Sequence, residues 1–296
     1  MSLIKGVLAF SCYVINTFFW MVPILSFGVL KLVPIRACIK LSNYVLDYSA
    51  TGWISVNTFI EKIFHPVQVH ISGSNDFSKN DWYMVLANHQ SWVDILVLQR
   101  VFNRNIPFLK FFLKKELLYV PVLGLAWWAL DFPFMRRYTT GQLRKNPKLK
   151  GKDIEITRKA CEKFKHKPVS IMNFVEGTRY TKEKHQQQNS PFEHLLRPKA
   201  GGLAFALSSM DECINKLIDV TVYYPEATPS FWHYISGQVK QVYVHIELSD
   251  ITNEMRGDYA KDREFKKRFQ QILNERWMQK DQIISRLKDQ SKEGMQ

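Results

Sequence analysis

The chain has 296 residues, of which 46% are hydrophobic and 14% aromatic, so it can bury a large core and is not a disordered protein. Lysine and arginine number 41 against 27 aspartate and glutamate, which gives a formal net charge of +14. This excess favours an anionic partner, such as lipid, a phosphorylated substrate or nucleic acid, without choosing among them. The four cysteines are far apart and form no C-x-x-C pair, which argues against a disulfide framework and against a cysteine metal site.

An apolar stretch without charged residues, Gly6 to Leu30, lies near the start of the chain. It is longer than the roughly 20 residues that cross a bilayer, although Pro23 could also mark a segment that dips into one leaflet and returns. Basic residues are more numerous after the stretch than before it, which places the bulk of the chain in the cytoplasm. No small-residue cleavage site follows, so an uncleaved membrane anchor is preferred to a signal peptide, and a buried core helix is the remaining alternative.

Helical and strand-like patterns then alternate. Residues 38–64 have helical periodicity, and two short apolar runs, Val67–Ser72 and Asp81–Ala87, are typical of strands. A third, weaker run at Ile106–Leu113 predicts a buried strand.

The segment Asn88-His89-Gln90-Ser91-Trp92-Val93-Asp94 joins the second of these strands to a helix. Ser91 is expected to cap the helix, with Asp94 three residues later. His89 then lies just before the first turn and can fold back toward the Asp94 carboxylate. A neutral imidazole held by an anionic partner is a general base. A simple capping box with a surface histidine is the alternative for this spacing taken alone.

The uncharged segment Leu117–Leu130 is too short for a confident membrane span, and an interfacial helix and a core helix remain equally open. Two guanidinium groups, Arg136 and Arg137, follow it and are suited to binding phosphate. The basic residues 144–152 are expected to form a surface loop, and residues 154–164 a helix.

A strand is predicted at Val169–Val175, and it runs directly into Glu176-Gly177-Thr178-Arg179. Loops at strand ends carry functional groups in α/β folds; the glycine permits close approach and Arg179 offers bidentate anion binding. The polar residues 181–193 are interpreted as a mobile loop. Lys199 and two glycines precede an apolar helix at 203–210.

Two further strands are predicted near the C-terminal end, at residues 217–224 and 242–248. The tail from Asp258 has an apolar stripe at helical spacing and is charged elsewhere, which predicts an amphipathic helix or helix pair. Packing of this tail on the domain is favoured over binding to anionic lipid, because amphipathic helices usually face a core.

Four blocks, in this order, resemble the glycerolipid acyltransferase family, in particular the 1-acylglycerol-3-phosphate acyltransferases. Asn88-His89 with Asp94 matches the family's N-H-x-x-x-x-D signature, and Glu176-Gly177-Thr178-Arg179 matches its E-G-T-R. The segment from Lys115 to Arg137 and the strand ending at Pro225 are similar to the second and fourth blocks, and Lys199 to the lysine of a Lys-x-Gly that follows the third. Val175 and the stretch 220–224 depart from the family, which usually has proline there.

The resemblance implies an α/β fold, a mixed sheet wrapped by helices of the glycerol-3-phosphate acyltransferase type, after an N-terminal membrane-bound helical segment. It divides the chain into a membrane anchor (1–40), an acyltransferase domain (41–250) and a C-terminal amphipathic helical tail (251–296). The expected location is a bacterial inner membrane, with the catalytic domain in the cytoplasm as the basic residues after the apolar stretch indicate, and the endoplasmic reticulum is the second choice.

The implied reaction moves a fatty acyl group from acyl-CoA or acyl-carrier protein to the free hydroxyl of a lysophospholipid, most plausibly lysophosphatidic acid, with no metal or cofactor and no nucleic-acid partner. His89 and Asp94 are the expected catalytic pair. The expected substrate-binding residues are Glu176, Gly177, Thr178, Arg179, Arg136, Arg137 and Lys199. Three alternatives stay open: another lysophospholipid headgroup, a metal hydrolase, and a non-catalytic basic membrane-bound binding protein.

Overall fold

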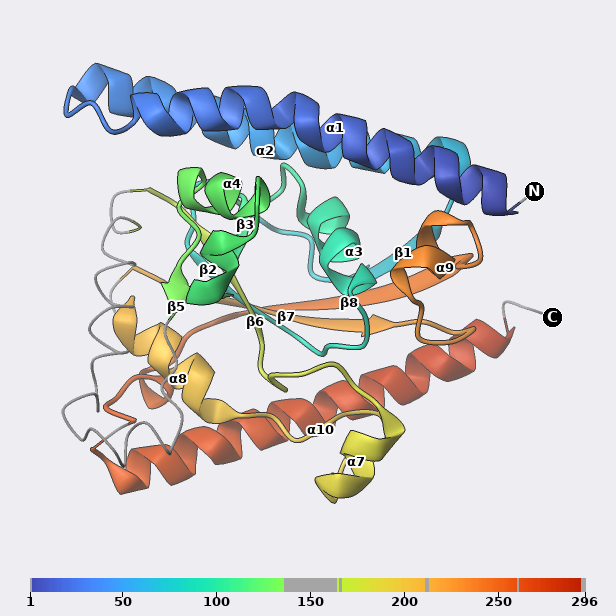
Figure 1. Ribbon diagram of the computed structural model, residues 1–296. Helices are drawn as coiled ribbons and strands as arrows, with labels where there is room; N and C mark the ends of the chain where they lie inside the picture. The colour runs from blue at the N-terminus through green and yellow to red at the C-terminus, as the bar shows by residue number, and fades with distance from the viewer. Residues whose placement is uncertain (1, 136–163, 165–166, 211–212, 260, 294–296) are drawn as a thin grey trace.

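A mixed β-sheet forms the centre of the molecule, with helices above and below it (Figure 1). The computed structural model describes residues 2–135, 164, 167–210, 213–259 and 261–293. Within these residues the main sheet has six strands in the order β1-β8-β7-β2-β6-β3, and a two-stranded sheet pairs β4 with β5.

Four neighbouring strands of the main sheet, β7, β2, β6 and β3, are parallel, while β8 runs antiparallel to β7 and parallel to β1. The strands are β1 (Gln68–Gly73), β2 (Tyr83–Ala87), β3 (Leu109–Phe111), β4 (Leu113–Lys114), β5 (Phe134–Met135), β6 (Ser170–Phe174), β7 (Lys216–Tyr223) and β8 (Gln241–Asp250). The central position of β2 follows from its sequence, because all five of its residues are apolar or aromatic and all are buried.

Side chains of β2 alternate between two hydrophobic clusters, one on each face of the sheet. Tyr83, Val85 and Ala87 pack with residues of α3 and α1, whereas Met84 and Leu86 pack with residues of α8 and α10. The sheet is therefore covered on both faces, as is usual for a sheet whose central strands are parallel.

The helices occupy the following ranges: α1 (Ser2–Leu30), α2 (Arg36–Phe64), α3 (Val93–Phe102), η1 (Lys115–Tyr119), α4 (Leu123–Ala129), α7 (Lys182–Gln187), α8 (Ala200–Ser209), α9 (Phe231–Ile235), η4 (Asn253–Met255) and α10 (Arg263–Glu293). Helices α1 and α2 form an antiparallel hairpin along the top of the molecule, and α10 crosses the opposite side (Figure 1).

A buried polar network joins the hairpin to α3. The Tyr13 hydroxyl of α1 donates to Glu61 Oε1 of α2 at 2.8 Å, and Arg100 of α3 pairs with Glu61 Oε2 at 3.2 Å. The network is thus anchored on α3, the helix that carries Asp94.

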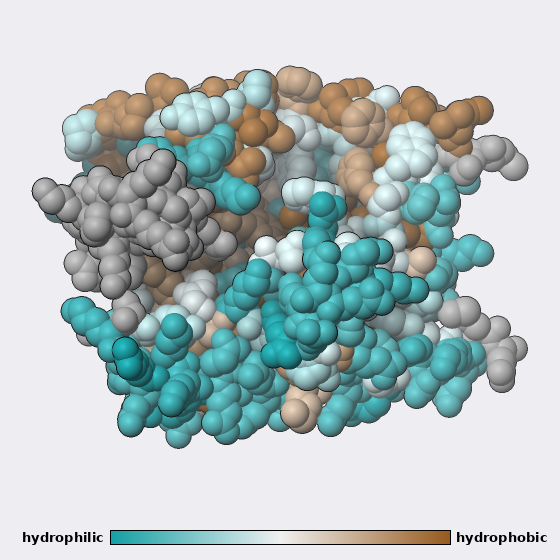
Figure 2. Space-filling model, turned by 60° about the horizontal axis from the view of Figure 1, so that its bottom comes forward, coloured by the Kyte–Doolittle hydropathy of each residue, from teal (hydrophilic) through white to brown (hydrophobic). Residues whose placement is uncertain are grey.

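The exposed surface of the hairpin is largely apolar. Brown, hydrophobic residues gather along the top of the space-filling view, whereas the lower part over α10 is hydrophilic (Figure 2). α1 is also long and apolar enough to cross a membrane by length and composition. The two sides of the molecule therefore suit two different environments.

Most elements expected from the sequence are present, with three corrections. The N-cap position of α3 is Trp92 rather than Ser91, but the Trp92 side chain makes no capping bond, and it is the Ser91 hydroxyl that accepts from the Val93 N–H at 3.1 Å. The segment expected to be a mobile loop contains the short helix α7, whose cap is Thr181. The segment 117–130 is neither one helix nor a span; it forms η1 and α4, and α4 packs against the hairpin.

The C-terminal tail is one helix, α10, and it packs on the domain as expected. Phe265, Phe269 and Trp277 are buried in the cluster below the sheet. The buried Lys280 ammonium pairs with Asp219 of β7 at 2.5 Å, which fixes the helix to a central strand. The expected loop at 144–152, the expected helix at 154–164 except for Phe164, and Cys161 lie outside the described residues.

Candidate active site

Three parallel strands end at the same edge of the sheet and deliver the motif residues to it. In register, Ala87 of β2 lies between Phe174 of β6 and Val220 of β7. His89 therefore follows β2 at the edge where Glu176 follows β6 and Tyr224 follows β7. This is the edge at which parallel α/β sheets place their ligands.

The structure brings His89 and Asp94 together. His89 Nδ1 lies 2.9 Å from Asp94 Oδ2. The carboxylate is fully buried, while the imidazole is 13% exposed. Asp94 also accepts hydrogen bonds from the backbone N–H groups of Gln90 at 2.7 Å and Ser91 at 2.9 Å. The loop between β2 and α3, residues 88–92 (the histidine loop), is therefore folded around the Asp94 carboxylate.

Two residues that were not predicted complete this arrangement. The hydroxyl of Tyr224, 130 residues away in sequence, donates to Asp94 Oδ1 at 2.7 Å. Burial, with the neighbouring Asp94 carboxylate, raises the pKa of Tyr224 well above its usual value, so the phenol remains a donor. The ring of Phe174 stacks on the imidazole at 3.9 Å.

Asn88 fixes the start of the loop by a reciprocal pair of bonds with Val222 of β7. Its Nδ2 donates to the Val222 carbonyl, and its Oδ1 accepts the Val222 N–H, each at 2.9 Å. The side chain thus extends the parallel pairing of β2 and β7 by one residue and sets the position from which His89 leaves the sheet.

The chemistry of the pair follows from these partners. Because the Asp94 carboxylate accepts a hydrogen bond from His89 Nδ1, the proton of the neutral imidazole is held on Nδ1, and Nε2 is left as an acceptor. A partly exposed imidazole beside a buried carboxylate that accepts four hydrogen bonds can remove a proton from a hydroxyl group.

Residues 68–229, more than half of the chain, match the family model described as Acyltransferase. The chain belongs to the acyltransferase family.

Several relatives of this acyltransferase are named 1-acyl-sn-glycerol-3-phosphate acyltransferases. It is 23% identical over 267 residues to a protein named probable 1-acyl-sn-glycerol-3-phosphate acyltransferase 5 from Arabidopsis thaliana, covering 85% of this chain and 68% of that one. It is 29% identical over 119 residues to 1-acyl-sn-glycerol-3-phosphate acyltransferase alpha from Homo sapiens, covering 40% of this chain and 37% of that one. The chain thus spans about two thirds of the first relative and little more than a third of the second.

The fold matches a crystal structure of the 1-acyl-sn-glycerophosphate (LPA) acyltransferase PlsC from Thermotoga maritima. The TM-score is 0.50 at 18% identity, and the match covers 99% of this chain and 98% of that chain. This similarity confirms the predicted fold class, a mixed α/β sheet wrapped by helices.

The loop after β6, residues 175–181, directly contacts the histidine loop of the acyltransferase. The Tyr180 N–H donates to the His89 carbonyl at 2.7 Å, and the Lys199 N–H donates to the Val175 carbonyl at 2.8 Å. Gly177 has φ of +69°, and the Lys199 ammonium lies about 3.6 Å from where its Cβ would be. Gly177, Thr178, Arg179 and Lys199 are therefore gathered beside His89.

Glu176 faces the opposite way from the exposed part of this loop. It is fully buried, near the backbone of His89 and Leu196 and the indole of Trp277, and neither carboxyl oxygen has a well-formed hydrogen bond with a described residue. Burial raises the pKa of Glu176 to about 8, so it is mostly uncharged at neutral pH. No atom of the side chain is exposed, so the structure does not show a Glu176 surface that a substrate could contact. The expected substrate-binding role of Glu176 stays a prediction.

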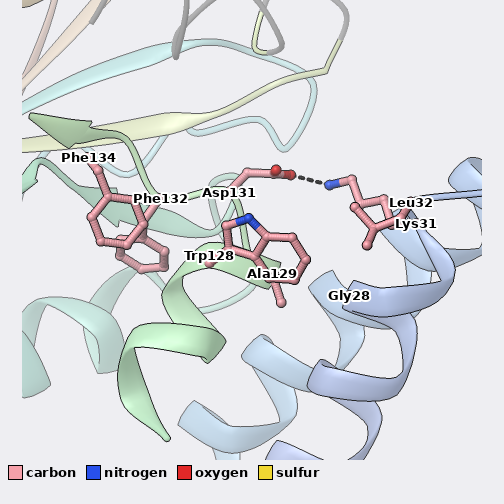
Figure 3. A pocket seen from close by; sticks show the side chains of 8 residues that line it. All are labelled: Gly28, Lys31, Leu32, Trp128, Ala129, Asp131, Phe132 and Phe134. Atoms are coloured by element: carbon pink, nitrogen blue, oxygen red, sulfur yellow. Dashed lines mark hydrogen bonds and ion pairs between the residues drawn. The ribbon is translucent and has the colours of Figure 1, made fainter. Parts of the chain in front are cut away.

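A pocket of about 350 Å³ lies between the end of α1 and the segment that follows α4 (Figure 3). Trp128, Phe132 and Phe134 line it, and the Lys31–Asp131 ion pair lies beside it. Stacked rings continue inward from Phe132 through Phe111 and Phe174 to the His89 imidazole. An aromatic wall thus connects the α1–α2 hairpin with the edge of the sheet that carries His89.

Two of the expected site residues, Arg136 and Arg137, lie outside the described residues. Among the described residues, no three histidine, cysteine, aspartate or glutamate side chains are grouped as a metal site would need.

Proposed function

We propose that the chain transfers a fatty acyl group from an acyl thioester, acyl-CoA or acyl-carrier protein, to the free hydroxyl of lysophosphatidic acid, forming phosphatidic acid. The observation that carries the proposal is the His89–Asp94 contact of 2.9 Å at the ligand-binding edge of an acyltransferase fold. The names of the relatives from Arabidopsis thaliana and Homo sapiens support this choice of acceptor.

The reaction needs one base and no cofactor, because the thioester is already activated. His89 Nε2 removes the proton of the lipid hydroxyl as its oxygen attacks the thioester carbonyl. Asp94 keeps Nδ1 protonated and stabilises the imidazolium that forms. The C–S bond then breaks, and the imidazolium returns the proton to the departing thiolate, so that no covalent acyl-enzyme is formed.

The acceptor phosphate is bound by the loop after β6. Arg179 is exposed, and its guanidinium group can contact two phosphate oxygens at once. Lys199, next to Gly177, adds a second cation on the same side. The fatty acyl chain of the lysophospholipid lies against the aromatic wall that runs from His89 toward the hairpin.

The hairpin places this site at the membrane surface, and it does so without crossing the bilayer. Near its start, α1 contacts the domain at Gly6, which lies against Trp232 and Ser236. Near its end, it contacts the domain at Gly28, which lies against Ala129. A helix held to the domain at both ends lies parallel to the membrane, with its exposed apolar face in one leaflet.

The test is an acyl-transfer assay with purified protein, labelled acyl-CoA and lysophosphatidic acid. The wild-type chain is expected to form labelled phosphatidic acid. His89→Ala should lower the rate by about 100-fold or more, because positioned general-base catalysis is of that size.

His245→Ala is the matched control, since His245 also has a ring-nitrogen partner, Ser72, but lies on β8 away from the site. It should keep the wild-type rate. A wild-type rate from His89→Ala, or no product with any lysophospholipid and donor, contradicts the proposed function.

A further inference from the structure

Trp92 is an exposed tryptophan inside the histidine loop, and packing does not explain it. The residue is 58% exposed, whereas its neighbours Ser91 and Val93 are buried. It makes no side-chain capping bond to α3. A large aromatic side chain exposed between the two catalytic residues is therefore available for contact with another group.

The group that lies over Trp92 is the guanidinium of Arg179. The Arg179 Cζ is 5.0 Å from the centre of the indole ring, within the range of a cation–π contact. No carboxylate pairs with Arg179 in the part of the chain that the structure describes. Because a ring face occupies none of the five N–H donors, the guanidinium is held in place while its hydrogen-bonding edge stays free.

The backbone of Arg179 is fixed as well. The Lys184 ammonium of α7 donates to the Arg179 carbonyl at 3.0 Å and to the Thr178 hydroxyl at 2.8 Å. The Tyr180 N–H, one residue later, is bonded to the His89 carbonyl. The stacked pair is therefore attached on one side to the catalytic histidine and on the other to α7.

We propose that Trp92 is a positioning residue that sets specificity for a phosphate headgroup, because its indole face holds the Arg179 guanidinium beside the catalytic histidine with its donors free. This inference rests on the proposed acceptor-binding role of Arg179. It assigns Trp92 to neither the acyl donor nor the membrane surface, the two other groups that an exposed indole can contact.

Direct binding tests the inference without turnover. In the His89→Ala background, calorimetry with a short-chain lysophosphatidic acid below its micellar concentration gives the Kd. Adding Trp92→Ala should raise this Kd about three- to tenfold, since cation–π contacts at partly exposed sites are of that size. Trp92→Phe, which keeps an aromatic face, should recover part of the loss. The monoacylglycerol with the same chain should bind equally to all three proteins.

A double-mutant cycle shows whether Trp92 acts through Arg179. The Trp92→Ala change should have little further effect once Arg179→Ala is present, so the two effects should not add. Tyr119→Ala removes another exposed aromatic side chain, outside the proposed site, and should leave the Kd unchanged.

Three results overturn the inference: additive effects in the cycle, an equal loss of monoacylglycerol binding, or a loss confined to acyl-CoA binding or to vesicle binding. A failure of the proposed function is distinguishable from these. If the wild-type chain acylates no lysophospholipid while the cycle still shows coupling for the phosphate ligand, the reaction is wrong and the Trp92–Arg179 site stands.

Discussion

At the catalytic edge, two buried carboxyl groups have opposite surroundings. Asp94 accepts hydrogen bonds from His89, two backbone N–H groups and the Tyr224 hydroxyl. Glu176 has no comparable set, and burial raises its pKa to about 8. The two carboxyl groups of the motifs thus differ in their hydrogen-bond partners, and Glu176 is the one that burial keeps mostly uncharged at neutral pH.

The pH dependence of the folded chain's stability should reveal that Glu176 is uncharged in the folded state. Its pKa is about 8 in the folded chain and 4.5 when solvated, so between these values the folded state retains a proton that the unfolded state has lost. Stability therefore falls as pH rises from 4.5 to 8. Glu176→Gln, which is neutral throughout, should show a smaller fall in denaturation midpoint between pH 5 and pH 8.

Glu183→Gln is the appropriate control for this measurement. Glu183 is exposed at the start of α7, where backbone hydrogen bonding lowers its pKa, so it is ionised in both states over the same range. Its substitution should leave the slope unchanged. A Glu176→Gln variant with the wild-type slope shows that the carboxyl group is charged in the folded chain.

At the scale of elements, α10 supports residues 175–199, which are proposed to bind the acceptor (the acceptor loop), although α10 lies outside the residues that match the family model. Asp281 of α10 accepts the backbone N–H groups of Glu193 and His194, each at 2.8 Å. Arg197 then binds the carbonyl of Asn189 at 2.7 Å, next to the end of α7. This series of contacts extends from α10 through α7 to Thr178 and Arg179.

Removal of the Asp281 carboxylate should therefore weaken acceptor binding. Asp281→Ala leaves two backbone donors of the loop without their acceptors, and we expect the KM for the lysophospholipid to rise several-fold while the KM for the donor changes little. Initial-rate kinetics with each substrate varied in turn measure both constants.

Asp289→Ala, on the same helix, is the control, because this carboxylate is exposed and pairs only with Lys292 among the described residues. It should not change either constant. An equal rise in both KM values for Asp281→Ala indicates a general loss of structure rather than a displaced acceptor loop.

The elements also show what local sequence can predict. The strands β2 and β6 and the helix α10 were expected correctly, because apolar periodicity is a local signal. Tyr224 was missed because its only link to Asp94 is spatial, across 130 residues. The helix α7 was missed because its residues, Lys182–Gln187, carry no apolar stripe and are stabilised by contacts such as that of Lys184 with Thr178.

At the scale of the whole molecule, the apolar residues exposed to solvent are concentrated in the hairpin. α1 alone exposes eleven large hydrophobic side chains: Leu3, Ile4, Val7, Leu8, Phe10, Val14, Ile15, Phe18, Phe19, Val22 and Val29. The long helix α10 exposes Met278 and otherwise presents charged and amide side chains. The molecule therefore has one apolar side and one hydrophilic side (Figure 2), and the apolar side is the one proposed to contact lipid.

This division predicts which substitutions affect membrane binding. Phe19→Asp should reduce co-sedimentation with phospholipid vesicles, because it places a charge on the face proposed to enter the acyl region. Met278→Asp, at a similarly exposed position on α10, should bind vesicles as the wild-type chain does. Equal binding by all three proteins shows that the hairpin is not the membrane contact.

The attachment of α10 to the sheet has a consequence for partial unfolding. The Lys280 ammonium pairs with Asp219 of β7, and Trp277 is buried in the cluster below the sheet. β7 leads directly into Tyr224, whose hydroxyl binds Asp94. Because α10 cannot detach without leaving a buried charge unpaired, local opening of this helix and loss of the His89–Asp94 geometry should occur together.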